Sequence, residues 1–424
     1  MKKRTLMIHH QHPQVGKVAS QKWGRLTQTL ILLFSLIIIL GLVNPTLAQI
    51  SDSDLVFGMS TALTGPAADL GDNMKAGVLA GFHRANTDGG LHGRKLRLIA
   101  LDDGYEPSRT TPNIRKLIEQ DHVLGIIGNV GTPTAMAALP IIHEHHTLFF
   151  APFTGAGILR KVPPDRSVIN YRASYEEETA AMIDALITIG KVQPQQIAFF
   201  TQRDGYGDAG FNGGLIALKQ HGLQNEHQII HVRYERNTLA VEDALATIFL
   251  AGSLPKAVIM VGAYAPCAKF IRLAREAGLD ALFFNVSFVG SMPLASDLGP
   301  EEFRTIITQV VPHPLESTLP LVKEFQQDLQ TYDSKRTPTF GNLEGYIAAR
   351  ILIRALSNMT GPITRETIVS ALEQLGTFDL GLEHPLQLDP SHHQANHQVW
   401  ATQLKKGKVV PFDWKNLPQV LKGR

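Results

Sequence analysis

Three threonines in two short segments could form a site for an anion. Thr132 and Thr134 flank Pro133, and Thr154 lies in a second segment of turn-forming residues. Threonine followed by proline is typical of a helix start, because threonine caps the helix and proline has no amide hydrogen to leave unpaired. Such a start offers free N–H groups and the positive end of the helix dipole, which together bind a carboxylate without an arginine. From the residues alone, ordinary caps and turns of an α/β sheet are the favoured interpretation, and an anion site is the alternative.

Sequence motifs for catalysis are absent, since the chain contains neither Gly-x-Ser-x-Gly nor Gly-x-x-x-x-Gly-Lys-Ser/Thr. Cys267 is the only cysteine and has no evident base partner, and it cannot form an intramolecular disulfide. Asp102 and Asp103 form a carboxylate pair, but a pair at the end of an expected strand is typical of a capped turn. We therefore predict that the protein is not an enzyme.

Two groups of residues invite a metal interpretation that their spacing does not support. The cluster His-Glu-His-His at 143–146 lacks the His-Glu-x-x-His spacing of a zinc-protease helix. Asp204 and Asp208 lack the regular acidic spacing of a calcium loop. We expect no metal site and no cofactor.

Apolar runs of strand length alternate with segments of helical period along the chain. Strands are expected at residues 55–61, 96–101, 123–127, 148–150, 197–200, 228–232, 257–261 and 282–285. Helices are expected between them and beyond, around residues 74–85, 179–189, 211–220, 241–250, 268–277, 319–332 and 344–356. This alternation is typical of βαβ units, so the fold class is α/β with doubly wound parallel sheets.

Candidate site residues follow the expected strands. Ligands bind to such sheets at the carboxyl ends of the strands. Three segments with turn-forming or polar residues start there, at 128–134, 151–156 and 202–208. We therefore expect these three segments to meet at one crevice.

The first 48 residues predict export. A run of fourteen residues from Leu30 to Val43 follows six Lys and Arg residues and precedes the small-residue site Thr46-Leu47-Ala48. This order is typical of a Sec-type signal peptide that is cleaved before Gln49, and it predicts a periplasmic protein. An uncleaved membrane anchor is the alternative, but fourteen residues fall short of the roughly 20 that a spanning helix needs. The long basic segment also leaves open a start codon later than Met1.

The net charge and the length of the chain after residue 48 limit which functions and folds are possible. Six of the 40 Lys and Arg residues and none of the 38 acids precede residue 49, which leaves 34 bases against 38 acids and a net charge of −4. Nucleic-acid binding is therefore not expected. About 376 residues remain, and a chain of this length folds as two lobes more readily than around one core.

Several motifs follow one another along the chain. They are Ser-Thr-Ala-Leu-Thr-Gly-Pro at 60–66, Leu-Gly-Asp at 70–72, the segment 86–95, Asp-Asp at 102–103, the segment 128–140, Arg-Ala-Ser-Tyr at 172–175, Tyr-Gly at 206–207 and Glu-Gly-Tyr-Ile-Ala-Ala-Arg at 344–350. In this order they resemble the substrate-binding proteins of ABC importers, in particular the branched-chain amino-acid type with the type I periplasmic binding protein fold. The likeness runs from about residue 55 to about residue 410. It is carried by the order of the motifs rather than by any single one.

The resemblance implies two lobes joined by a three-segment hinge, with ligand bound between them. Crossings are expected near residues 172–174, 311–313 and 375–378. The N-terminal lobe then comprises residues 49–172 and 312–375. The C-terminal lobe comprises residues 173–311 and 376–424. Ligand closes such lobes about the hinge, and the closed form is recognised by a membrane permease.

The resemblance also implies ligand-binding residues, and it favours an anion site at Thr132, Thr134 and Thr154 over ordinary caps and turns. Tyr206 and Tyr264 match positions where similar proteins place aromatic side chains against the ligand, while Thr154 and Gly155 lie in the segment expected to face them. Branched-chain binders meet the ligand ammonium with an acidic residue, but here Ser287 stands at that position. Either another acid such as Asp204 turns inward, or the ligand lacks that charge. An amino acid is the first expectation, and an amide or a small carboxylic or aromatic acid is the alternative.

The expected partners are a small-molecule ligand and an ABC permease in the inner membrane, with no stable membrane insertion after cleavage. A receptor of the same fold could instead report ligand occupancy to a signalling protein. An exported hydrolase is a third interpretation, which the missing nucleophile motif disfavours.

Overall fold

The computed structural model describes residues 54–301 and 304–422. The predicted signal peptide, residues 1–48, and its membrane-anchor alternative lie outside the described residues. Within the described part, two separate sheets carry most of the strands, and each is covered by helices. None of the described helices is long and apolar enough to cross a membrane.

The first sheet has five strands, all parallel, in the order β2-β1-β3-β4-β5. The strands are β1 (Leu55–Thr61), β2 (Leu96–Asp102), β3 (Gly125–Ile127), β4 (Leu148–Phe150) and β5 (Val168–Ile169). Every residue of β1 is buried, as expected for a central strand covered on both faces. We call this sheet and the helices on it the first lobe.

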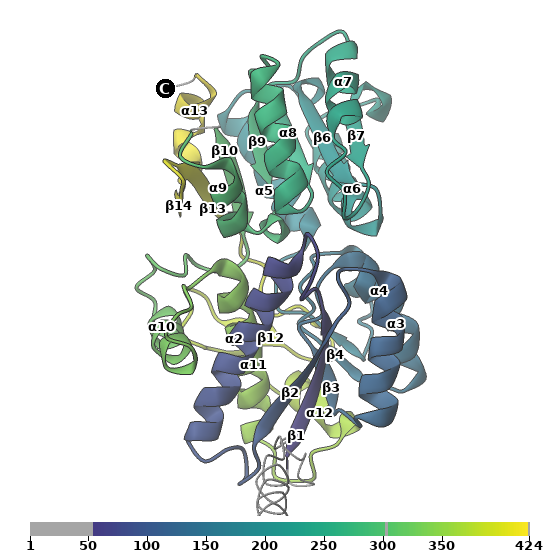
Figure 1. Ribbon diagram of the computed structural model, residues 1–424, viewed down its shortest axis with the longest axis vertical. Coiled ribbons are helices and arrows are strands. Elements are labelled where there is room, and N and C mark those ends of the chain that lie inside the picture. The colour runs from purple at the N-terminus through teal and green to yellow at the C-terminus, as the bar shows by residue number, and fades with distance from the viewer. Residues whose placement is uncertain (1–53, 302–303, 423–424) are drawn as a thin grey trace, which may run out of the picture. The chain divides into compact units, whose positions relative to one another are not determined.

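The helices of the first lobe cover both faces of this sheet (Figure 1). They are α2 (Ala68–Thr87), α3 (Pro107–Arg115), α4 (Thr132–Glu144), α10 (Pro320–Tyr332), α11 (Phe340–Ser357) and α12 (Arg365–Glu373). Helices α2 and α11 pack especially closely, because glycines lie at their contact. A Cβ added at Gly77 would lie 1.9 Å from the carbonyl oxygen of Asn342, and one at Gly345 would lie 2.3 Å from that of Met74.

The second sheet has seven strands in the order β14-β13-β10-β9-β8-β6-β7. They are β6 (Ile197–Gln202), β7 (His231–Tyr234), β8 (Ala257–Val261), β9 (Leu282–Asn285), β10 (Thr305–Gln309), β13 (Trp400–Lys405) and β14 (Lys408–Pro411). The strands are parallel except that β13 runs antiparallel to both β10 and β14. Its helices are α5 (Tyr175–Asp184), α6 (Gly205–Gln220), α7 (Glu242–Leu250), α8 (Tyr264–Glu276), α9 (Ser291–Leu298) and the C-terminal α13 (Leu417–Leu421), and together they form the second lobe.

The chain passes from one lobe to the other three times. The first passage lies between β5 and α5, and the second lies between β10 and α10. The third differs from our expectation of residues 375–378. The hairpin of β11 (Gly376–Phe378) and β12 (Leu386–Leu388) stays with the first lobe, since the carbonyl of Asp379 accepts a hydrogen bond from Arg354 at 2.7 Å. The passage instead follows Asn396, whose amide still bonds the carbonyl of Tyr171 at 2.8 Å, and it ends where β13 begins.

The α/β class and the parallel sheets are as the sequence predicts. The three candidate segments do begin at the carboxyl ends of strands, because β3, β4 and β6 end at Ile127, Phe150 and Gln202. The fold therefore brings these segments to the edges of the sheets at which the lobes contact each other.

Candidate ligand site

Helix α4 begins at Thr132, and Gly131 occupies the cap position with a φ of 102°. We predicted Thr132 as the cap, but no side chain caps this helix. The ring of Tyr105 lies directly over the turn, so that a Cβ added at Gly131 would be 2.0 Å from Cε2 of Tyr105. In this conformation a protein side chain therefore covers the turn that we expected to be open to a carboxylate.

The three predicted threonine hydroxyls are buried and differ in what they contact. The Oγ1 atoms of Thr132 and Thr154 lie 2.6 Å apart, so one donates to the other across the segments that follow β3 and β4. The hydroxyl of Thr134 instead donates to the carbonyls of Gly131, at 2.9 Å, and Val130. The fold thus brings Thr132 and Thr154 together, whereas the Thr134 hydroxyl is used within its own helix start.

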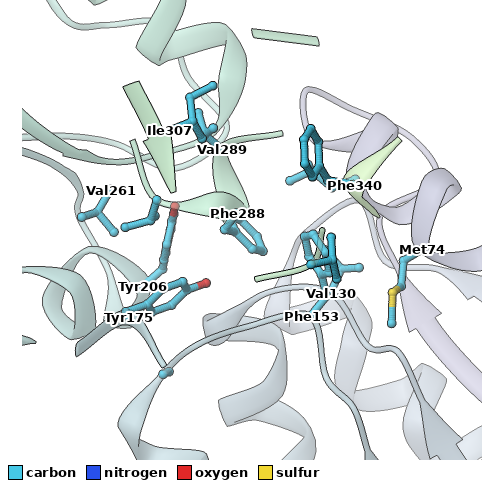
Figure 2. Packing of buried hydrophobic residues seen from close by; sticks show 14 of the residues in the cluster. Met74, Val130, Phe153, Tyr175, Tyr206, Val261, Phe288, Val289, Ile307 and Phe340 are labelled. Atoms are coloured by element: carbon cyan, nitrogen blue, oxygen red, sulfur yellow. The ribbon is translucent and has the colours of Figure 1, made fainter. Parts of the chain in front are cut away.

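Aromatic rings from both lobes fill the region between them (Figure 2). Phe288 of the second lobe lies between Tyr206 on one side and Phe153 of the first lobe on the other, at ring-centroid distances of 4.6 and 5.5 Å. Tyr105 of the first lobe is 5.9 Å from the same ring, and Tyr175 is 5.1 Å from Tyr206. Tyr206, which we predicted to face the ligand, is fully buried in this cluster.

Tyr264 lies apart from the aromatic cluster, at the start of α8, and is half-buried. Gly290 follows the short helix Ser287–Val289, and a Cβ added there would be 2.7 Å from Leu70 of the first lobe and 3.4 Å from the ring of Tyr264. Tyr264 therefore lies close to the point where the two lobes touch. The carbonyl of Gly155 accepts a hydrogen bond from the amide of Tyr175 at 2.8 Å, where the chain enters α5 after its first passage between the lobes.

Ser287 is held by a buried carboxylate that we did not predict as a site residue. Its amide and hydroxyl donate to the two oxygens of Glu178 at 2.7 and 2.9 Å. Thr308 donates a third hydrogen bond to the same carboxylate, at 2.5 Å. Asp204, which we considered as an alternative acid, instead caps α6 and lies 3.3 Å from Arg236. The acid beside Ser287 is therefore Glu178, and its acceptors are used by the protein.

A second buried carboxylate, Glu344 of α11, lies near the first. Arg172 is 1% exposed and lies between them, with Nη2 3.8 Å from Glu178 and Nε 3.6 Å from Glu344. Nη2 also donates to the hydroxyl of Ser287, and the guanidinium lies 4.7 Å from the ring centroid of Phe153. Nε and Nη1 of Arg172 have no hydrogen-bond acceptor among the described residues.

Burial dominates the ionisation of this cluster. It raises the pKa of Glu344 to about 7, against the attraction of Arg172 and with added repulsion from Glu178. Burial also raises the pKa of Glu178, although Arg172 and three hydrogen bonds oppose it. Both acids therefore lie near one arginine, Arg172, and burial disfavours the charged form of each.

Two cavities have walls from both lobes. The smaller measures about 20 Å³, room for about one water molecule, and its wall includes Leu70 and Glu344 of the first lobe and Ser287 and Gly290 of the second. The larger measures about 680 Å³ and opens between the starts of α4, α5 and α6. Thr132 and Gly155 line the larger cavity, and Ser287 lines the smaller. An amino-acid-sized ligand fits the smaller cavity only if side chains or lobes move apart.

The sequence carries a signal for Glu178 and Glu344 that we did not use. Each is an acid on the buried face of a helix, Glu178 beside Thr179 and Met182, and Glu344 between Leu343 and Gly345. A charged residue within an apolar helix face needs a partner or a function. Which partner it has depends on residues far away in the chain.

These features together define a two-lobed solute-binding protein, and comparison with known proteins agrees. The family described as periplasmic binding protein matches residues 55–408, so the chain belongs to the periplasmic binding protein family. Its members bind solutes and are not enzymes. The resemblance, the fold and the absence of catalysis predicted from the sequence are thereby confirmed.

Three similar proteins illustrate the relationship. A structure titled as a possible leucine/isoleucine/valine-binding protein from Rhodopirellula baltica SH 1 shares 49% identity and a TM-score of 0.83, over 87% of this chain and 99% of that one. The Leu/Ile/Val-binding protein homolog 2 of Brucella abortus is 25% identical over 77% of this chain and 84% of its own length. A solute-binding protein of R. palustris in complex with benzoate shares the fold, with 20% identity, a TM-score of 0.72 and coverage of 85% and 95%.

Proposed function

We propose that this protein is a periplasmic receptor that binds a small polar ligand, an amino acid, between its lobes and delivers it to an ABC importer. The observation that carries the proposal is the crevice whose walls come from both lobes, with Leu70 and Phe153 on one side and Ser287 and Gly290 on the other. A ligand held by both walls stabilises the closed arrangement over the open one. The permease can then distinguish the loaded from the empty receptor.

The amino-acid assignment is supported by the names of relatives and by buried acids beside Ser287. Relatives at 25% and 49% identity carry leucine/isoleucine/valine-binding names. Two carboxylates, Glu178 and Glu344, lie near the position where Ser287 replaces the acid of branched-chain binders. A small aromatic acid is the alternative, since the crevice is rich in aromatic rings and one protein of this fold is in complex with benzoate.

Thermal-shift screening tests the proposal directly. A ligand that binds only the folded protein raises the melting temperature, by an amount that grows with ligand concentration. Amino acids, their amides, and aliphatic and aromatic acids are screened at several concentrations. A shift with one of these classes supports the receptor function. No shift with any small solute contradicts it.

Location and partner need separate experiments. The signal-like segment at 1–48 supports export to the periplasm, which is tested by fractionating cells that express the full chain and sequencing the N-terminus of the product. Transport is tested by uptake of the identified ligand in cells with and without the gene. A sensing role would leave uptake unchanged and alter a transcriptional response instead.

A further inference from the structure

The wall of the small cavity offers hydrogen-bond acceptors and no basic side chain. Of the described residues that line it, the ionisable ones are Glu344, which is buried, and Asp69, which is exposed at the rim. Glu344 is 3% exposed, and no donor among the described residues lies within hydrogen-bond distance of its carboxylate. Among the described residues, the cation within 4 Å of this carboxylate is Arg172, whose Nε lies 3.6 Å away, too far for a hydrogen bond.

Gln309 adds a second free acceptor to the same wall. Its Nε2 donates to the hydroxyls of Ser291 and Thr402 at 2.7 and 2.9 Å. Thr402 already donates its proton to the carbonyl of Ile307, so it can only accept from Gln309, and this fixes the orientation of the amide. The Oε1 atom of Gln309 is therefore left buried, with no hydrogen-bond donor from the part of the chain that the structure describes.

The charges around the cavity do not balance. Arg172 supplies one positive charge to the two carboxylates Glu178 and Glu344. Arg160 also acts on Glu344 electrostatically, but it is linked through Gln394 to Glu177, an acid that pairs with His397 at 2.6 Å. With both acids ionised, the group formed by Arg172, Glu178 and Glu344 carries one negative charge in excess.

We propose that Glu344 and the Oε1 of Gln309 form the subsite for a positively charged nitrogen of the ligand. The cavity of about 20 Å³ has the size of one ammonium group. An ammonium group supplies the missing positive charge and donates hydrogen bonds to the two acceptors. This inference rests on the proposed function. It assigns the acid that meets the ammonium to Glu344, on α11 of the first lobe, instead of to the position of Ser287 in the second lobe. The ligand class it specifies is primary amines, including amino acids.

Calorimetric titration with matched compounds tests the subsite. The purified protein is titrated with leucine, valine and phenylalanine, with the corresponding acids that lack the amine (4-methylpentanoate, 3-methylbutanoate and 3-phenylpropanoate), and with 3-methylbutylamine. We expect one or more of the amino acids to bind at least about tenfold more tightly than its deaminated partner, because a charge-assisted hydrogen bond is lost. Binding of 3-methylbutylamine, which has no carboxylate, would likewise support the subsite.

The variant Glu344→Gln isolates the carboxylate. It should weaken binding of the amino acid or amine about 10- to 100-fold and change binding of a deaminated acid by less than about twofold. Glu366→Gln, the same change on the exposed start of α12, is the matched control and should leave all affinities unchanged.

The wild-type protein provides a readout that does not depend on the variant folding. The pKa of Glu344 is raised to about 7, and the charged or titratable groups that act on it are Arg172, Glu178, Arg160 and Tyr171. An ammonium requires the ionised carboxylate, so binding at pH 7 should release about half a proton. Titration in two buffers of different ionisation enthalpy measures this release, and a deaminated acid should give none.

Two results separate the inference from the proposed function. Deaminated acids that bind as tightly as the amino acids, or amino-acid binding that is unchanged in Glu344→Gln, overturn the subsite and leave the receptor function standing. Failure of every compound to bind, in this panel and in the wider thermal screen, overturns the receptor function and the subsite with it.

Discussion

The Nε atom of Arg172 lies 3.6 Å from Oε1 of Glu344, at the point where the chain first passes between the lobes. The same guanidinium donates through Nη2 to Ser287 of the second lobe. Arg172 therefore contacts polar groups of both lobes while lying beside the passage that joins them. A change in the charge of Glu344 should consequently affect both stability and ligand binding.

The pH dependence of stability should differ between wild type and Glu344→Gln. The folded-state pKa of Glu344 is raised from its ordinary value of 4.5 to about 7, so the folded protein holds the proton more tightly than the unfolded chain. This contribution is complete below pH 4.5 and is lost as the pH rises through about 7. Chemical denaturation between pH 5 and pH 8 should show wild type losing up to about 3 kcal/mol relative to the variant. Parallel pH profiles would contradict the raised pKa.

The hydroxyl pair of Thr132 and Thr154 should behave as a coupled unit. Thr154→Val leaves the buried Thr132 hydroxyl without its 2.6 Å partner, which should cost about 1–3 kcal/mol of unfolding free energy. The double variant with Thr132→Val should recover part of that loss, because no unpaired hydroxyl then remains. A double-mutant cycle by urea denaturation measures the coupling, and strictly additive effects would show that the pair is not coupled.

We also expect Thr154→Val to weaken ligand binding.

Glu106 of the first lobe links the two lobes through its carboxylate. It forms an ion pair with Arg236 of the second lobe at 2.9 Å and accepts a hydrogen bond from Asn237 at 2.5 Å. Glu106→Gln should shift the equilibrium toward the open form by up to about 1 kcal/mol, with little change in unfolding. Small-angle scattering during ligand titration should show that more ligand is needed for closure. The control Glu119→Gln removes an exposed partner of Arg115 within the first lobe and should leave the scattering curves unchanged.

Gly131 should tolerate no side chain, because it combines a φ of 102° with the close approach of Tyr105. Gly131→Ala should lower the unfolding free energy by at least about 2 kcal/mol. Gly222→Ala is the matched control, since its φ is 90° and nothing lies within 4 Å of the added Cβ. The difference between the two variants in thermal unfolding isolates the Tyr105 clash. In a Tyr105→Ala background, Gly131→Ala and Gly222→Ala should lower the unfolding free energy by similar amounts.

The sequence predicted the elements whose pattern is local. The runs at 55–61, 148–150, 257–261 and 282–285 coincide with β1, β4, β8 and β9, because continuous apolar runs of that length are typical of buried parallel strands. The antiparallel strands β13 and β14 were not predicted. They lie at one edge of the second sheet, and buried and exposed residues follow each other in them without regular alternation, so their sequence signal is weak.

The sequence by itself determined the α/β class, the family and the segments that follow the strands, since these depend on local periodicity and on the order of motifs. Only the tertiary structure decided the state of the site. It placed Tyr105 over Gly131 and directed the hydroxyl of Thr134 to the carbonyl of Gly131 at the start of its own helix. It also brought Arg172 and Glu344 together. Each of these contacts depends on where distant parts of the chain meet, and no local pattern encodes that packing.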